Sequence, residues 1–117
     1  PRMNLIDAAW HGPNTISAGG AEIAGPEGIV GSDTVTVGLR PEHLVLSSPT
    51  SGGLAATVDF CEYLGGTRYL YCQLPDGQNL VAEQRDGDDL AAGATANFTW
   101  KPKDLRLFDA QGARLGV

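Results

Sequence analysis

Short apolar segments, rich in β-branched residues and bounded by glycine or proline, recur along the whole chain. The 117 residues include 16 Gly and 7 Pro, and no long segment repeats its apolar residues at the 3.6-residue period of an amphipathic helix. This pattern is typical of an all-β barrel or sandwich. A chain of this length predicts a single domain, residues 1–117, that buries enough surface to hold a core without disulfides.

The segments also predict an order of elements. Strands are expected at residues 4–10, 33–40, 54–64, 68–74, 78–84 and 94–100, with a loose hairpin about Gly19 and Gly20. One short helical turn is expected at 41–44 and another at 88–92, and we find no clean internal repeat. The long curved pair of strands that begins at Leu54 favours an OB-fold-like small Greek-key barrel, to which the N-terminal strands before Gly38 add a further layer.

The stretch Arg40-Pro41-Glu42-His43 interrupts the strand pattern and admits two interpretations. As chemistry, His43 could act as a general base oriented by Glu42. Adjacent side chains rarely converge on one point, however, and no Ser or Cys nucleophile motif accompanies them. As structure, Pro41 ends regular strand pairing because it has no N–H to donate, Arg40 pairs with a carboxylate, and Leu44 fills the core. We expect a structural corner.

Other patterns of catalytic or ligand-binding residues are incomplete. His11 and His43 lie in different segments and lack the spacing of metal ligands. The acidic stretch 86–89 has no Glu at the position that would complete a calcium loop. Gly65-Gly66 joins two expected strands and is followed by no Lys-Ser or Lys-Thr, so it predicts a hairpin turn and no phosphate site. We therefore expect no catalytic, cofactor or metal site.

Charge and composition argue against several partners. The net charge of −6, with the eight Lys and Arg residues scattered along the sequence, disfavours binding to nucleic acid. The aromatic residues are expected in the core or in cross-strand pairs such as Phe60 with Phe98. Cys61 and Cys72 are expected to be reduced thiols that pack as small apolar residues, since no secretory leader is apparent.

Five stretches together resemble a known family. They are PRMN, VTVGLRPEHL, VDFCEYLGGTRYLY, GQNLVAE and LRLFDAQGARL, in this order along the chain. The set is similar to the C-terminal regulatory region, the transport-associated OB (TOBE) domain, of MalK-like ATP-binding subunits of ABC sugar importers. The resemblance implies that the chain is a fragment that follows an absent ATPase domain. That domain would bind ATP and Mg²⁺, whereas the fragment itself would be non-catalytic and free of cofactors.

The resemblance also implies partners and roles. The same domain of a second subunit would pack against this one to form a homodimer. The membrane subunits of the transporter would be reached through the ATPase domain, at the cytoplasmic face of the plasma membrane, and a regulatory protein could bind as well. Arg40, Pro41, Glu42 and His43 would form the corner that joins two folds. The stretch Glu62-Tyr63-Leu64-Gly65 would be a dimer or partner surface.

Two alternative functions stay open at this point. A molybdate-type OB module would bind an oxyanion through backbone N–H groups or a positive pocket, and the acidic composition argues against it. A nucleic-acid-binding OB domain would need basic and aromatic residues on one face of a sheet, and it ranks below the oxyanion module.

Overall fold

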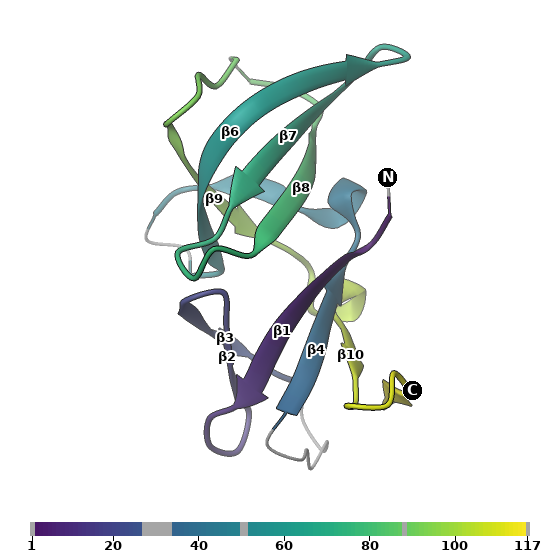
Figure 1. Cartoon of the computed structure of the whole chain (residues 1–117). Coiled ribbons are helices and arrows are strands. Elements are labelled where there is room, and N and C mark those ends of the chain that lie inside the picture. Colours follow the sequence, from purple (N-terminus) through teal and green to yellow (C-terminus); the bar gives the residue numbers. More distant parts are fainter. Residues whose placement is uncertain (1, 27–33, 50–51, 88, 117) are drawn as a thin grey trace.

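The computed structural model describes residues 2–26, 34–49, 52–87 and 89–116. Within these residues the chain forms short strands and two single 3₁₀ turns (Figure 1). The elements are β1 (Asn4–Trp10), β2 (Thr15–Ala18), β3 (Ala21–Ala24), β4 (Thr34–Leu39), η1 (Pro41–His43), β5 (Val45–Ser47), β6 (Leu54–Leu64), β7 (Thr67–Gln73), β8 (Asn79–Gln84), β9 (Thr95–Thr99), η2 (Pro102–Asp104), β10 (Arg106–Phe108) and β11 (Arg114–Leu115). The all-β prediction is confirmed.

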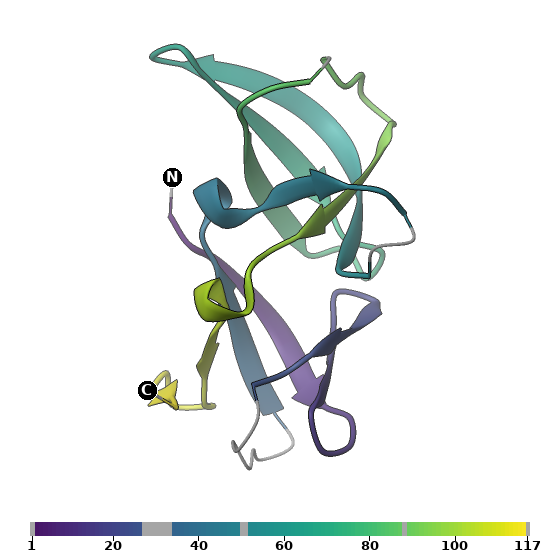
Figure 2. The same ribbon diagram turned by 180° about the vertical axis from the view of Figure 1, so that it is seen from behind.

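The strands pair into two antiparallel sheets. Sheet A has the order β11-β10-β4-β1-β2-β3, and sheet B has the order β5-β9-β6-β7-β8. In sheet B the consecutive strands β6, β7 and β8 are followed by β9, which returns to lie beside β6. This is the arrangement of a Greek key, as expected. The strands before Gly38 form a second sheet together with β10 and β11, and the two sheets are stacked along the long direction of the molecule (Figure 2).

Two expectations about local structure are wrong. The described part of 88–92 contains no helical turn, and the second turn lies instead at Pro102–Asp104. Phe60 and Phe98 do not pair: Phe98 is 1% exposed in the core and Phe60 is 52% exposed. A bulge between Val58 and Phe60 reverses the alternation of side chains along β6. Phe60 therefore faces outward and stacks on Tyr71, with 4.5 Å between ring centroids.

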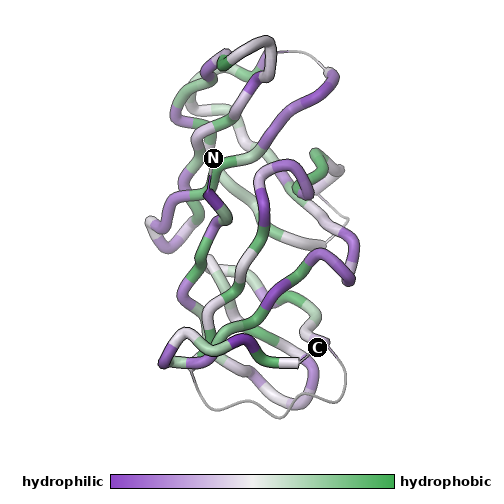
Figure 3. Tube along the Cα trace, turned by 90° about the vertical axis from the view of Figure 1, so that its right-hand side faces the viewer, coloured by the Kyte–Doolittle hydropathy of each residue, from purple (hydrophilic) through white to green (hydrophobic). Residues whose placement is uncertain are grey.

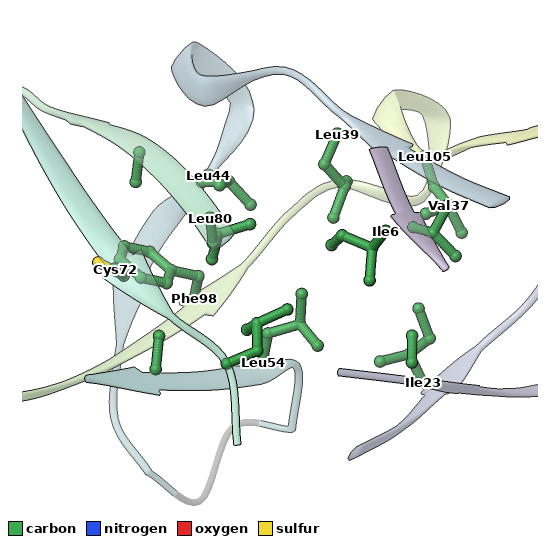
Figure 4. Close-up of a cluster of buried hydrophobic side chains, with 14 of the residues drawn as sticks. Ile6, Ile23, Val37, Leu39, Leu44, Leu54, Cys72, Leu80, Phe98 and Leu105 are labelled. Atoms are coloured by element: carbon green, nitrogen blue, oxygen red, sulfur yellow. The ribbon is translucent and has the colours of Figure 1, made fainter. Parts of the chain in front are cut away.

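A single hydrophobic core runs through both sheets (Figure 4). Sheet A contributes Ile6 and Val37, and sheet B contributes Leu80 and Phe98; each is at most 1% exposed. Each such side chain contributes about 1.5–3 kcal/mol when it is removed from water. Leu44 follows η1 and is 4% exposed, which confirms its expected place in the core.

Side-chain amides join sheet A to β8, which is an edge strand of sheet B. The amide of Asn4, on β1, donates to the backbone O of Val81 at 2.8 Å and accepts from the Val81 N–H at 2.8 Å. Its Nδ2 also donates to the backbone O of Leu39 at 3.0 Å. Gln78 binds the backbone of Asp7 in the reverse direction, at 2.7 and 3.1 Å. The Asn4 amide thus satisfies the edge of β8 at Val81, and the Gln78 amide satisfies the backbone of β1 at Asp7, as a neighbouring strand would.

Candidate functional site

The corner at Arg40–His43 is half of a bent two-stranded ribbon that crosses between the sheets. β4 passes through η1 into β5, and β9 passes through η2 back into β10. Gly38 pairs with Arg106 in sheet A, and Val45 pairs with Thr99 in sheet B. Equal numbers of residues lie between these pairs on the two strands, so the register is the same on both sides of the bend.

The two turns of the ribbon have the same geometry. Arg40 precedes η1 at φ −75°, ψ 141°, and Lys101 precedes η2 at φ −77°, ψ 140°. In each turn a proline supplies the first helical position, where its missing N–H is not needed. The backbone N–H of His43 donates to Arg40 at 3.0 Å, and that of Asp104 donates to Lys101 at 2.9 Å. The corner motif is therefore used twice in this chain.

The side chains of His43 and Asp104 approach each other across the two turns. His43 Nδ1 lies 3.8 Å from the carboxylate of Asp104, whose side chain is 11% exposed. The carboxylate that faces His43 is thus on the other strand of the ribbon and is not that of Glu42. Among the described residues, Arg40 forms no ion pair, which contradicts the expected one, and its side chain does not cap η1. The four predicted corner residues lie together at this bend.

The corner does not carry the parts of a catalytic or metal site. Within the described residues, no Ser or Cys side chain is a hydrogen-bond partner of His43, and no group of three His, Cys, Asp or Glu is arranged to hold a metal ion. Arg85 donates to the backbone O of Glu42 at 2.9 Å. This contact fixes η1 against the end of β8, which is a structural role.

The predicted partner surface lies at the end of the β6–β7 hairpin. β9 pairs with β6 only along Leu54–Thr57, and the far end of the hairpin extends beyond it (Figure 1). Gly65 and Gly66 form the turn at φ 58° and 87°, a left-handed pair that suits a two-residue hairpin. We call residues 60–67 the hairpin tip.

The hairpin tip presents different groups on its two faces. The hydroxyl of Tyr71 donates to the carboxylate of Glu62 at 2.9 Å, and this hydrogen bond raises the pKa of Tyr71. On the other face, the hydroxyl of Tyr63 donates to Asp89 at 3.0 Å, and the Arg68 guanidinium also binds Asp89. The predicted surface residues are therefore divided: alternation along β6 puts Tyr63 on the face opposite Glu62.

Large apolar side chains are exposed at the hairpin tip. Phe60 is 52% exposed, Tyr63 is 61% exposed and Leu64 is 50% exposed. Phe60 and Leu64 lie on one face of the hairpin and Tyr63 lies on the other, and exposed large apolar side chains of this kind are enriched at contact surfaces. The family resemblance predicts a dimer or partner surface at Glu62, Tyr63, Leu64 and Gly65, and that role stays a prediction.

The two thiols lie on β6 and β7 and are both free. Burial raises the pKa of the Cys72 thiol to about 12, and nearby Asp59 and Cys61 add to the shift. The Cys61 thiol lies 3.3 Å from the backbone O of Leu90 and donates to it. Cys72 thus packs in the core as a small, protonated side chain, and Cys61 packs against the core.

One hollow at the surface has the size of a small-ligand site. It has a volume of about 580 Å³, lies between β3 and η2, and its described lining includes Glu22 and Trp100 but no Lys or Arg. An oxyanion would find a carboxylate there and no cation, so this hollow does not favour the oxyanion-binding interpretation.

Two family models match this chain. The TOBE domain matches residues 37–108, and the MalK OB fold domain matches residues 1–44. The two matches overlap on β4 and η1, where the chain crosses from sheet A to sheet B. Neither model describes an ATP-hydrolysing domain.

Several curated proteins are similar over most of the chain. A lactose transport ATP-binding protein of Rhizobium radiobacter is 37% identical over 73% of this chain and 24% of its own length. The sn-glycerol-3-phosphate import ATP-binding proteins of Chromohalobacter salexigens and Salmonella choleraesuis are 32% and 34% identical, over 98% and 95% of this chain and 32% of their own length. The chain thus spans about a quarter to a third of these relatives. Within the described residues, no helix is long and apolar enough to cross a membrane.

Proposed function

The chain belongs to the TOBE domain family, and on this premise we propose that it is a non-catalytic regulatory and dimerisation module of the ATP-binding subunit of an ABC importer for sugars or related solutes. The relatives that match it are named as ATP-binding proteins of transport or import systems. The observation that carries the proposed role is the exposed apolar hairpin tip, which needs a partner to be removed from water.

The proposal includes a larger assembly. An ATPase domain elsewhere in the same polypeptide would bind ATP and Mg²⁺ and would connect the module to the membrane subunits. The assembly would then lie at the cytoplasmic face of the plasma membrane. The module itself would hold no cofactor and no nucleic acid, and a regulatory protein could bind at the same surface.

Self-association of the module has a clear physical use. An importer opens and closes two ATPase domains around nucleotide, and the domains separate during this cycle. A contact between two modules keeps the separated domains at high effective concentration, which for short flexible connections is in the millimolar range. No catalytic residue is required for this role.

The test uses the full-length polypeptide that contains this chain. We expect Glu62→Lys together with Leu64→Asp to weaken self-association, measured by sedimentation equilibrium, because the pair removes apolar area and reverses a charge at the hairpin tip. A matched control is Glu22→Lys with Leu5→Asp, since Leu5 is 63% exposed on sheet A, away from the tip. Equal association of both variants and the wild type would remove the hairpin tip from the proposal.

A second comparison tests the role itself. Deletion of residues 1–117 from the full-length polypeptide is expected to lower self-association while ATP hydrolysis remains measurable. A deletion variant that associates as tightly as the wild type would contradict the dimerisation role.

A further inference from the structure

The hollow between β3 and η2 lies along the free edge of sheet A. β3 is the last strand of that sheet, and within the described residues it pairs only with β2. The described lining includes Glu22, Ile23 and Ala24 from β3 on one side, and Trp100 and Leu105 from the chain between β9 and β10 on the other. Figure 2 shows these two segments on the face of the molecule that points toward the viewer.

The backbone of β3 offers unpaired polar groups along this edge. Hydrogen-bonded and non-bonded pairs alternate between antiparallel strands, and the Gly25 N–H donates to the backbone O of Asn14, on the β2 side, at 2.8 Å. The register therefore places Ile23 in a bonded pair and leaves Glu22 and Ala24 in non-bonded pairs. The N–H and C=O groups of Glu22 and Ala24 thus point away from β2, toward the free edge along which the hollow lies.

The floor and the far wall of the hollow are apolar. Ile23 is 4% exposed and Leu105 is 8% exposed, and Figure 4 shows both side chains in the sheet A half of the core. The core continues from one sheet into the other, as seen from the side in Figure 3, and it forms the floor of the hollow. In the far wall, Trp100 is half-buried and packs against this core.

This arrangement suits a ligand that has apolar faces and a rim of hydroxyl groups. A saccharide ring has C–H groups on its faces, which pack on the negative face of an aromatic ring. Its hydroxyls both donate and accept, as an edge of N–H and C=O groups requires. The volume of about 580 Å³ lies within the range of roughly 300–1,000 Å³ that small-ligand sites have. The described lining contains no Lys or Arg, so an anionic ligand would find no cation there.

An added peptide strand is the other occupant that an open sheet edge admits. The free edge of β3 is short, however, because the next outward-facing position after Ala24 is Pro26, which has no N–H to donate. A proline at this place prevents continued strand pairing, whereas a small ligand needs only a few polar groups. The edge therefore favours a small ligand over a strand.

We propose that the hollow binds a neutral mono- or disaccharide, with its hydroxyls on the edge of β3 and a ring face on Trp100. The inference goes beyond the proposed function, because it gives the module a ligand of its own and does not depend on self-association. The ligand contacts sheet A through β3 and the segment that leads from sheet B through Trp100. A ligand that binds only the folded site stabilises it, so occupancy fastens the two sheets to each other.

The test is isothermal titration calorimetry of the full-length polypeptide without nucleotide. The probes are glucose, maltose and lactose, with glucose 6-phosphate as the anionic comparison. We expect saturable binding of at least one neutral sugar and weaker binding of glucose 6-phosphate. Trp100→Ala should raise the dissociation constant roughly tenfold, because it removes the aromatic wall. Ala24→Pro should raise it roughly threefold or more, because it removes one N–H from the free edge and breaks no hydrogen bond of the sheet.

A matched control is Leu5→Ala, which removes an exposed apolar side chain that does not line the hollow and should bind sugar like the wild type. Absence of binding by every neutral sugar overturns the proposal, as does equal affinity for glucose 6-phosphate. Unchanged affinity in both Trp100→Ala and Ala24→Pro overturns it as well, and so does an equal loss of affinity in Leu5→Ala. Because Trp100 packs against the core, Ala24→Pro decides the question if Trp100→Ala does not fold.

A blocked peptide, Val-Thr-Val-Thr, tests the other occupant. Binding of this peptide that Ala24→Pro abolishes, without binding of any sugar, would overturn the proposal in favour of strand addition. None of these outcomes changes the expected self-association, which sedimentation measures separately.

Discussion

Removing the Asn4 amide should lower the free energy of unfolding by more than the loss of one hydrogen bond would, because this amide makes several. Asn4 is 8% exposed and makes three hydrogen bonds to the backbone, two with Val81 and one with Leu39. In Asn4→Ala these backbone groups lose their partners at a site that is buried at Leu39 and partly buried at Val81. The substitution therefore removes the link between β1 and the edge of β8 as well as local contacts.

The cost follows from the number of bonds. Each hydrogen bond contributes roughly 0.5–1.5 kcal/mol net, and a buried group left unpaired costs about 1–3 kcal/mol. Asn4→Ala should then lower the free energy of unfolding by roughly 2–4 kcal/mol, out of about 5–15 kcal/mol for a domain. At an m-value of about 1.5 kcal/mol/M, the urea midpoint should fall by roughly 1–3 M.

The assay is equilibrium urea unfolding followed by tryptophan fluorescence, since Trp10 and Trp100 lie in sheet A and beside the corner. Gln78→Ala is the matched control, because it removes an amide that binds backbone at an exposed site. That change should cost less than about 1 kcal/mol, as water replaces the lost bonds. Equal costs for the two variants would refute the argument that burial of the Asn4 amide couples the sheets.

Three further predictions concern single positions. Gly53 has φ +87°, and a Cβ there would lie 2.1 Å from the backbone O of Phe98, whereas Gly66 has the same φ with open space around it. In urea unfolding, Gly66→Ala should lower the free energy of unfolding by about 1–2 kcal/mol, and Gly53→Ala should lower it several-fold more. Equal losses for the two variants would contradict the close approach at Gly53. In the native chain at pH 8, iodoacetamide should modify Cys61 well before Cys72, because Cys72 is 2% exposed and its pKa is about 12. Mass spectrometry of Cys61→Ser and Cys72→Ser variants would show the order of modification. Faster modification of Cys72 would contradict this prediction. Since folding raises the pKa of Cys72 above its ordinary value of 9.0, its contribution to stability should be complete below pH 9 and fall as the pH rises toward 12.

Local patterns predicted most of the strands because the alternation of side chains and the Gly and Pro breaks are local properties. The expected strand at 4–10 and the long strand at 54–64 match β1 and β6. The bulge after Val58 is also a local feature, but no residue pattern signalled it. Strict alternation from Leu54 would have turned Phe60 inward, and the extra residue turned it outward. The predicted pair with Phe98 failed for that reason.

Contacts between distant parts of the chain could not be predicted in the same way. The sequence signalled the corner at Pro41, but the partner of His43 is Asp104, on the opposite strand of the ribbon. One signal was available: Lys101-Pro102 and the Leu that follows repeat the spacing of the first corner.

The central claim is that this chain is the non-catalytic module of an importer ATP-binding subunit, and the most direct measurement is the sequence of the reading frame upstream of Pro1. The account predicts that the frame continues upstream and encodes an ATPase domain with a GxxxxGK[ST] phosphate-binding loop. A start codon directly before Pro1, with no ATPase domain in the frame, would contradict it.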